Sequence, residues 1–291
     1  MKTEKIPSGT LRLLMPQWQG GNYGETYPLG ARLLAWLAPE SAAPLVEVPV
    51  ENYDGTVPPV EGGIVGKTAL LKQQRAARKI IEAYQPDRVI TFGGDCLVSQ
   101  SPFAYLNERY DGDLGVLWID AHPDVTTPRD FAHEHAMVLG NLLGEGDPDF
   151  AAEVKVPIKP GRVLYVGVDE TLPWEAEVLE RLNLARVRSD EVVAGSGPVI
   201  DWIEKSGVRH LAIHLDLDVL DPGLFRSLLF NNPDADKPVD AAHGRLSFPR
   251  LTGLITDVAA RTDVVGLSIA EYMPWDAINL KNMMAAFPFM K

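Results

Sequence analysis

Acidic residues follow four apolar segments of the sequence, at the points where those segments end. The apolar segments are residues 88–92, 114–119, 211–215 and 264–269. In that order they lead into Gly93-Gly94-Asp95-Cys96, Asp120-Ala121-His122-Pro123-Asp124, Asp216-Leu217-Asp218-Val219-Leu220-Asp221-Pro222 and Ala270-Glu271. If the segments are strands of one parallel sheet, these residues meet beyond the carboxyl ends of the strands, where open α/β sheets bind ligands. The sequence therefore predicts one site rich in carboxylates.

The spacing within two of these segments indicates metal binding. Asp120, His122 and Asp124 are two residues apart, as are Asp216 and Asp218, so an extended backbone would point each set to one side. Buried like charges either take up protons or bind cations. Carboxylates with an imidazole suit Mn²⁺ better than an ion that prefers thiolates. The number of carboxylates predicts two divalent ions that share bridging aspartates.

A purely structural role is the alternative for any single aspartate. Asp95 and Asp120 stand where a side chain can cap a turn or the start of a helix. That explanation does not account for two acidic segments, residues 120–124 and 216–222, that each follow an expected strand.

The elements that must position these side chains alternate in type along the chain. Strands are expected at residues 11–14, 45–48, 88–92, 114–119, 162–168, 185–188, 211–215 and 264–269. Helices are expected at residues 67–84, 97–108, 173–182, 198–206 and 249–261, the last three with a proline in the first turn. This alternation predicts a three-layer α/β/α fold with a central, mostly parallel eight-stranded sheet. Residues 221–247 are expected to form a long loop with a functional role.

Length and composition favour one enzyme-sized domain over residues 1–291. The first ten residues have no apolar core, and no run approaches about 20 apolar residues, so neither a signal peptide nor a membrane helix is expected. A single cysteine, Cys96, fits a reducing compartment, here the cytoplasm. The net charge of −13 disfavours nucleic acid and anionic membranes as partners and is compatible with a small cationic or zwitterionic substrate.

The motifs resemble those of the ureohydrolases, which include arginase, agmatinase and formiminoglutamase. Members of that family carry G-G-D-H, D-A-H-x-D, D-x-D-x-x-D-P and a late glutamate, in this order. This chain has the corresponding residues 93–96, 120–124 and 216–222, followed by Glu271. The resemblance extends from about Gly93 to the C-terminus. It implies an arginase-like fold and a homo-oligomer, either a trimer or a hexamer.

The same resemblance implies a site with two metal ions, for which manganese is expected. One ion would be held by Cys96, Asp120, Asp124 and Asp216, and the other by Asp120, His122, Asp216 and Asp218. Asp120 and Asp216 would then bridge the two ions. His214, two residues before Asp216, is expected to orient a carboxylate rather than to bind metal.

The reaction that the resemblance implies is hydrolysis of a guanidino or formimino C–N bond by a metal-bridging hydroxide, which releases urea or formamide and an amine. Glu271 matches the family glutamate that holds the guanidinium nitrogens. His135 is the expected proton donor or shuttle, with His133 as the alternative. Both could instead be loop histidines at the surface.

Cys96 departs from the family pattern, because a histidine ligand usually stands at this position. A thiolate suits Zn²⁺, Fe²⁺ or Co²⁺ better than Mn²⁺, so these ions are alternatives. Cys96 could bind metal and shift the metal preference, bind weakly and leave one site partly empty, or be a buried residue that binds nothing.

The substrate loops depart as well. Residues 125–131 lack the Ser/Asn pattern with which arginases recognise the amino-acid end of arginine, and Arg129 could meet a substrate carboxylate or pair with Asp130. The sequence therefore does not choose between guanidino and formimino substrates. Two rival functions remain: a single-metal hydrolase like the histone-deacetylase-like amidohydrolases, and a catalytically impaired or non-catalytic relative that lost one metal site at Cys96.

Overall fold

The computed structural model describes residues 9–290. The expected absence of a signal peptide concerns residues 1–10, of which the first eight lie outside the described part. Within residues 9–290, no helix is both long and apolar enough to cross a membrane.

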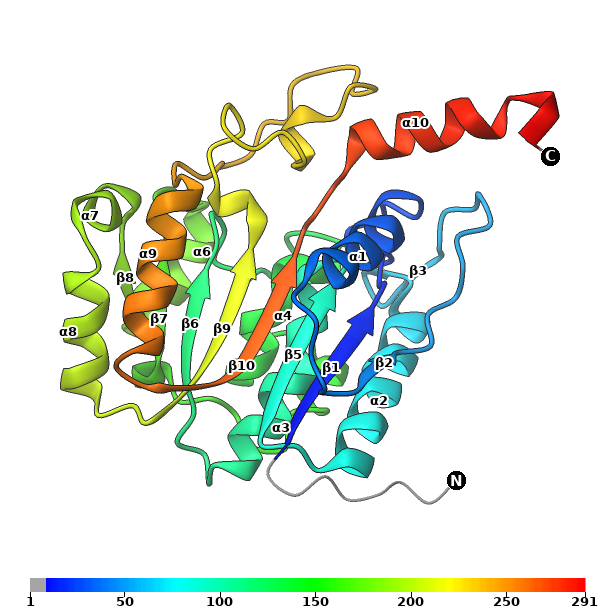
Figure 1. The fold of residues 1–291 in the computed structure, drawn as a ribbon. Helices are drawn as coiled ribbons and strands as arrows, with labels where there is room; N and C mark the ends of the chain where they lie inside the picture. The colour runs from blue at the N-terminus through cyan, green and yellow to red at the C-terminus, as the bar shows by residue number, and fades with distance from the viewer. Residues whose placement is uncertain (1–8, 291) are drawn as a thin grey trace.

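An eight-stranded sheet lies at the centre, and all of its neighbouring strands are parallel (Figure 1). The strands are β1 (Thr10–Met15), β2 (Leu45–Glu47), β5 (Arg88–Gly93), β6 (Gly115–Ile119), β7 (Val163–Val166), β8 (Ala185–Val187), β9 (His210–Asp216) and β10 (Asp263–Ala270). Their order is β2-β1-β5-β10-β9-β6-β7-β8. The eight expected strands are confirmed. A two-stranded hairpin of β3 (Val60–Glu61) and β4 (Ile64–Val65) was not predicted.

Helices cover both faces of the sheet, and the side chains of its strands alternate between two cores. Val116 and Trp118 of β6 belong to the core under α2, α3 and α6. Leu117 and Ile119 of the same strand face the core under α8 and α9. Successive residues of a strand point to opposite faces, so a central strand must be apolar throughout. The predicted three-layer α/β/α fold is confirmed.

The longer helices are α1 (Thr26–Leu37), α2 (Lys67–Tyr84), α3 (Gln100–Arg109), α6 (Pro173–Arg181), α8 (Gly197–Ser206), α9 (Phe248–Ala259) and α10 (Trp275–Ala285). The shorter ones are α4 (Val138–Leu143), α5 (Pro148–Ala151) and α7 (Ser189–Ala194). The three prolines expected in first turns lie there. The single helix expected at residues 97–108 is a 3₁₀ turn, η1 (Cys96–Ser99), followed by α3. Helices α1 and α10 were not predicted.

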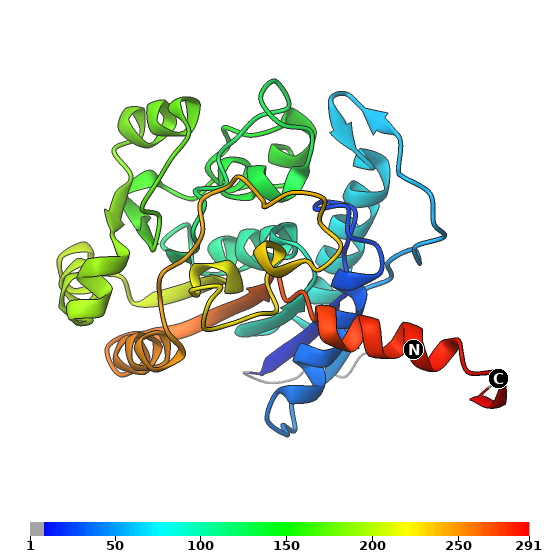
Figure 2. The ribbon, with the colours of Figure 1, turned by 90° about the horizontal axis from the view of Figure 1, so that it is seen from above.

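The carboxyl ends of the central strands open toward the long loop at residues 221–247. This loop holds one short 3₁₀ turn, η5 (Leu229–Asn231), and otherwise has no regular helix or strand, as expected. Seen from above, it crosses over the ends of the strands (Figure 2). Strands β5, β10, β9 and β6 are neighbours in the sheet, so the segments that follow them gather beneath this loop.

Candidate metal and catalytic site

Four side chains from three strand ends form one group of candidate metal ligands. Cys96, Asp120, His214 and Asp216 each offer a ligand atom within 4.8 Å of the others. Cys96 begins η1 after β5, Asp120 follows β6, and the other two belong to β9. All four are buried. Residues that are far apart in the sequence thus converge because their strands lie close together in the sheet.

A second group shares Asp120 with the first. His122 places Nδ1 2.9 Å from Asp218 Oδ2 and 3.6 Å from Asp120 Oδ1. These three side chains also offer ligand atoms within 4.8 Å of one another. Two adjacent groups that share an aspartate have the arrangement that two bridged ions need.

The backbone that follows Asp120 and Asp216 is not extended, which corrects the expectation drawn from the spacing of these aspartates. Asp216 is followed by a 3₁₀ turn, η4 (Leu217–Val219), and its Oδ1 accepts a hydrogen bond from Asp218 N at 2.7 Å. The chain also bends after Asp120, and Asp124 has a φ of 51°. The alternation of a strand therefore does not apply here, and these short-range turns orient the side chains instead.

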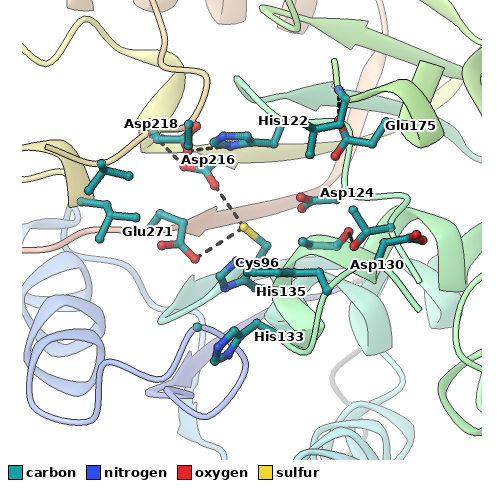
Figure 3. A pocket seen from close by; sticks show the side chains of 18 of the residues that line it. Cys96, His122, Asp124, Asp130, His133, His135, Glu175, Asp216, Asp218 and Glu271 are labelled. Carbon is teal, nitrogen blue, oxygen red and sulfur yellow. Dashed lines mark hydrogen bonds and ion pairs between the residues drawn. The ribbon is translucent and has the colours of Figure 1, made fainter. Parts of the chain in front are cut away.

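Asp124 lies in neither group of candidate ligands. Its carboxylate is nevertheless buried, lines the same cavity, and leaves Oδ2 without a hydrogen-bond partner. A non-glycine residue with positive φ is unusual and occurs often at functional sites. Asp124 thus lies in the same cavity as the two groups (Figure 3), but its carboxylate is not within ligand distance of either.

His214, which the sequence places as an orienting residue, lies within the first group of candidate ligands. Its Nδ1 lies 2.7 Å from Ser99 Oγ, its ring stacks on Trp118 with centroids 3.7 Å apart, and its Nε2, 3.6 Å from Asp120 Oδ2, has no hydrogen-bond partner. A ring held on one side with a free nitrogen on the other is typical of a metal ligand. The available signal was its place two residues before Asp216, on the same face of the strand.

The electrostatics of the site are those of crowded anions. Burial and neighbouring carboxylates raise the pKa of Asp124, Asp216 and Glu271 well above the usual range. Burial acts in the same direction on Asp120, but the neighbouring rings of His122 and His214 together outweigh it and lower the pKa of that carboxyl. Without a cation, such a site must take up protons to stay folded.

The residues present fit divalent cations. Among residues 9–290, the only ion-pair partners of these carboxylates are histidines, with no lysine or arginine. The unpartnered Asp124 Oδ2 and His214 Nε2 are buried lone-pair donors of the kind that a metal satisfies. Bound cations would remove the cost of gathering these acids in a buried site.

Cys96 lies within the first group, as its position in the sequence predicts. Its Sγ lies 3.0 Å from Asp216 Oδ2 and 3.6 Å from Glu271 Oε1 (Figure 3). Burial, followed by the charge of Asp216, raises the pKa of the Cys96 thiol well above its usual range. The thiol is therefore protonated near pH 7, and its single proton can be donated to Asp216 across the shorter of these two contacts.

Glu271 follows β10 and points into the same cavity. Its Oε2 accepts a hydrogen bond from Tyr27 at 2.5 Å, and its backbone N donates to Gly94 O at 2.9 Å. Its φ of 62° turns the chain out of the strand. Tyr27, from α1, was not identified from the sequence because the helix itself was not predicted.

His133 and His135 both line a cavity of about 480 Å³, together with His122, Asp124 and Glu271. Their rings are stacked with centroids 6.1 Å apart, and neither Nδ1 has a hydrogen-bond partner. Burial lowers the pKa of His135 to about 3 and also lowers that of His133. Both imidazoles are therefore neutral near pH 7.

Asp95 has the structural role that was the alternative for a single aspartate. Its carboxylate accepts hydrogen bonds from Leu97 N at 3.1 Å and Gly20 N at 2.9 Å, and it caps η1. It thereby holds Cys96 at the start of that turn.

Comparison with solved structures identifies the same fold in known enzymes. The arginase of Entamoeba histolytica in complex with L-ornithine has a TM-score of 0.75 at 20% identity and covers 93% of this chain and 92% of that one. The formimidoylglutamase of Bacillus subtilis has a TM-score of 0.68 at 17% identity, with 93% and 81% covered. At these identities the likeness concerns the fold.

Sequence comparison extends this likeness to the family. The arginase of Eremothecium gossypii is 26% identical over 195 residues, which are 64% of this chain and 46% of that protein. The arginase of Glaciozyma antarctica is 25% identical over 212 residues, 68% of this chain and 58% of that protein. The chain thus matches about half the length of these relatives. The model of the arginase family matches residues 42–227. This chain belongs to the arginase family.

Proposed function

We propose that the chain hydrolyses a C–N bond of a guanidino or formimino group with the help of two divalent ions. The observation that carries this proposal is the pair of ligand groups sharing Asp120 in one cavity with Glu271 and His135. The ions would be held by Cys96, Asp120, His122, Asp124, Asp216 and Asp218, with His214 as a further ligand. When bound, two such ions lower the pKa of water enough to supply a nucleophile near neutral pH.

Glu271 would orient the substrate. Its carboxylate suits a planar cation with two parallel N–H groups, because the two carboxylate oxygens can accept one hydrogen bond from each. Tyr27 already donates to Oε2, so this oxygen is held in place before substrate binds. Glu271 would thereby position the central carbon of the substrate and fix the orientation of the planar guanidino or formimino group.

His135 would carry the proton. Burial keeps this ring neutral at pH 7, which leaves the unpartnered Nδ1 able to take a proton from the attacking water and then deliver it to the leaving nitrogen. His133 stacks beside it and would serve as the alternative carrier. The products are urea or formamide and an amine.

Metal content and product release across a substrate panel test this proposal. The panel contains arginine, agmatine, guanidinobutyrate, guanidinopropionate, formiminoglutamate and alkylguanidines whose alkyl chain carries no polar group. Each compound is assayed for release of urea, ammonia and formamide. We expect about two ions per chain, manganese or else zinc, iron or cobalt, and turnover of at least one member. One ion per chain would favour a single-metal hydrolase. No bound metal and no turnover would favour a non-catalytic relative that lost a metal site at Cys96.

A further inference from the structure

Exposed apolar side chains surround the mouth of the cavity. Phe131, Leu172 and Trp174 line it and remain 43%, 48% and 39% exposed, whereas the candidate metal ligands that line it are mostly buried. Leu229 and Phe230 of the long loop line the same cavity and are half-buried. We call these five residues the apolar collar. Large apolar side chains that stay exposed around a concave site indicate a surface that a ligand covers.

The apolar collar is held by ordered contacts. The Phe131 ring lies 5.2 Å from the ring of His133 and 5.9 Å from that of His135, centroid to centroid. Leu172 precedes α6, and its backbone N donates to Glu175 Oε2 at 2.8 Å, which fixes the start of the helix that carries Trp174. Side chains positioned in this way can bind a ligand with little loss of conformational entropy.

Among the described residues, no lysine or arginine lines the cavity, so the only positive charge there belongs to the proposed metal ions and His122 beside them. Among the described residues, its charged lining consists of acids and histidines, and Asp130, Glu175 and Asp240 add to the acids of the metal groups. Arg129, which the sequence offered as a partner for a substrate carboxylate, is exposed and is not part of the lining. Away from the metal groups, a carboxylate on the substituent would therefore lose its hydration without a lysine or arginine to replace it, and it would lie near Asp130, Glu175 and Asp240.

We propose that the preferred substrate is a monosubstituted guanidine or amidine whose substituent is a hydrocarbon chain or an aromatic ring without a carboxylate. This inference rests on the proposed hydrolysis and names the substrate class of the same site. Water adds its oxygen to the central carbon, the bond from that carbon to the substituted nitrogen breaks, and the proton goes to this nitrogen. An apolar amine leaves, and the apolar collar is the surface that its substituent contacts.

A matched substrate series tests the apolar collar. Pentylguanidine, 4-aminobutylguanidine and 5-guanidinopentanoate share a four-methylene chain and end in a methyl group, an ammonium group and a carboxylate. We expect kcat/KM to be at least about tenfold higher for pentylguanidine than for 5-guanidinopentanoate. It should also be higher than for 4-aminobutylguanidine, whose ammonium group would lose its hydration against the apolar collar. From methylguanidine to pentylguanidine, kcat/KM should rise by up to about fourfold per methylene group. Preference for either charged end would overturn the proposal.

Substitution of one collar residue separates recognition from folding. Trp174→Ala should raise KM for pentylguanidine and 2-phenylethylguanidine about tenfold and leave methylguanidine unchanged. Trp36→Ala is the matched control, because Trp36 on α1 is 78% exposed and does not line the cavity. Equal losses for methylguanidine and pentylguanidine, or equal losses in both variants, would overturn the role of the apolar collar.

A binding measurement keeps this inference distinct from the proposed hydrolysis. Calorimetry with 2-phenylethylguanidine and methylguanidine, on the metal-loaded protein, measures how much the substituent adds to affinity. Tight binding of the phenyl compound without product release would refute the hydrolysis and support the collar. Turnover of guanidino acids with no gain from an apolar substituent would support the hydrolysis and refute the collar.

Discussion

The floor and the mouth of the cavity are built from different kinds of structure. Asp120, Asp216 and Glu271 stand at the ends of β6, β9 and β10, three neighbouring strands, and are buried. Phe131 lies in the loop after β6 and Trp174 in the first turn of α6, and both are exposed. Rigid strands fix the positions of the polar floor, whereas loops tolerate change in sequence. We infer that the floor determines the reaction and the mouth determines the substrate.

The largest effect should come from the aspartate that both ligand groups share. Asp120→Asn keeps the shape of the side chain but removes the charge needed to bridge two cations, so metal content should fall and kcat should drop on the order of a thousandfold. Metal analysis and urea release measure both. Asp130→Asn, at an acid that lines the cavity but lies outside the ligand groups, is the control. Full metal content in Asp120→Asn would contradict a bridging role.

A smaller loss, confined to turnover, is expected at the proton carrier. His135→Asn should lower kcat about a hundredfold and leave metal content unchanged, because proton transfer and not metal binding is lost. His133→Asn is the matched variant, since both rings line the cavity with an unpartnered Nδ1. If His133→Asn loses turnover and His135→Asn does not, the two roles are exchanged.

A change at Cys96 should alter which metal binds the floor. Cys96→His replaces a protonated thiol next to Asp216 by an imidazole, which suits Mn²⁺ better, so Mn²⁺ affinity should rise about tenfold. Titration followed by calorimetry measures this affinity, with Cys96→Ser as the control of similar size. Unchanged Mn²⁺ affinity in Cys96→His would show that this position does not contribute a ligand.

The floor could be predicted from the sequence because its signals are local. The motif at residues 120–124 and the pair Asp216 and Asp218 each lie at the end of an apolar segment, and these segments proved to be strands. Periodicity did not give the order of β5, β10 and β9 in the sheet, which brings His214 next to Cys96; that pair was accessible only through the resemblance and the position of His214 two residues before Asp216. Contacts between distant segments follow from topology, which periodicity does not encode.

The mouth could not be predicted for a related reason. Phe131 and Leu229 lie in irregular segments whose course depends on tertiary contacts, and no spacing rule connects them. Helix α1, which supplies Tyr27, begins without a side-chain cap, and α10 lacks a continuous buried stripe, so both lack the usual sequence signals. The acidic motifs at the strand ends were therefore easier to predict than the residues that surround the mouth of the cavity.

The smallest effect is expected at Phe131, which touches both regions. Its ring lies near His133 and His135, which line the cavity beside the floor, and the side chain is exposed at the mouth. If the two regions act separately, Phe131→Ala should raise KM for pentylguanidine about fourfold, through lost apolar contact, and leave kcat unchanged. Steady-state kinetics with pentylguanidine and methylguanidine measure this. A fall in kcat for methylguanidine would mean that Phe131 positions the histidines, and the mouth would then take part in the reaction as well as in the choice of substrate.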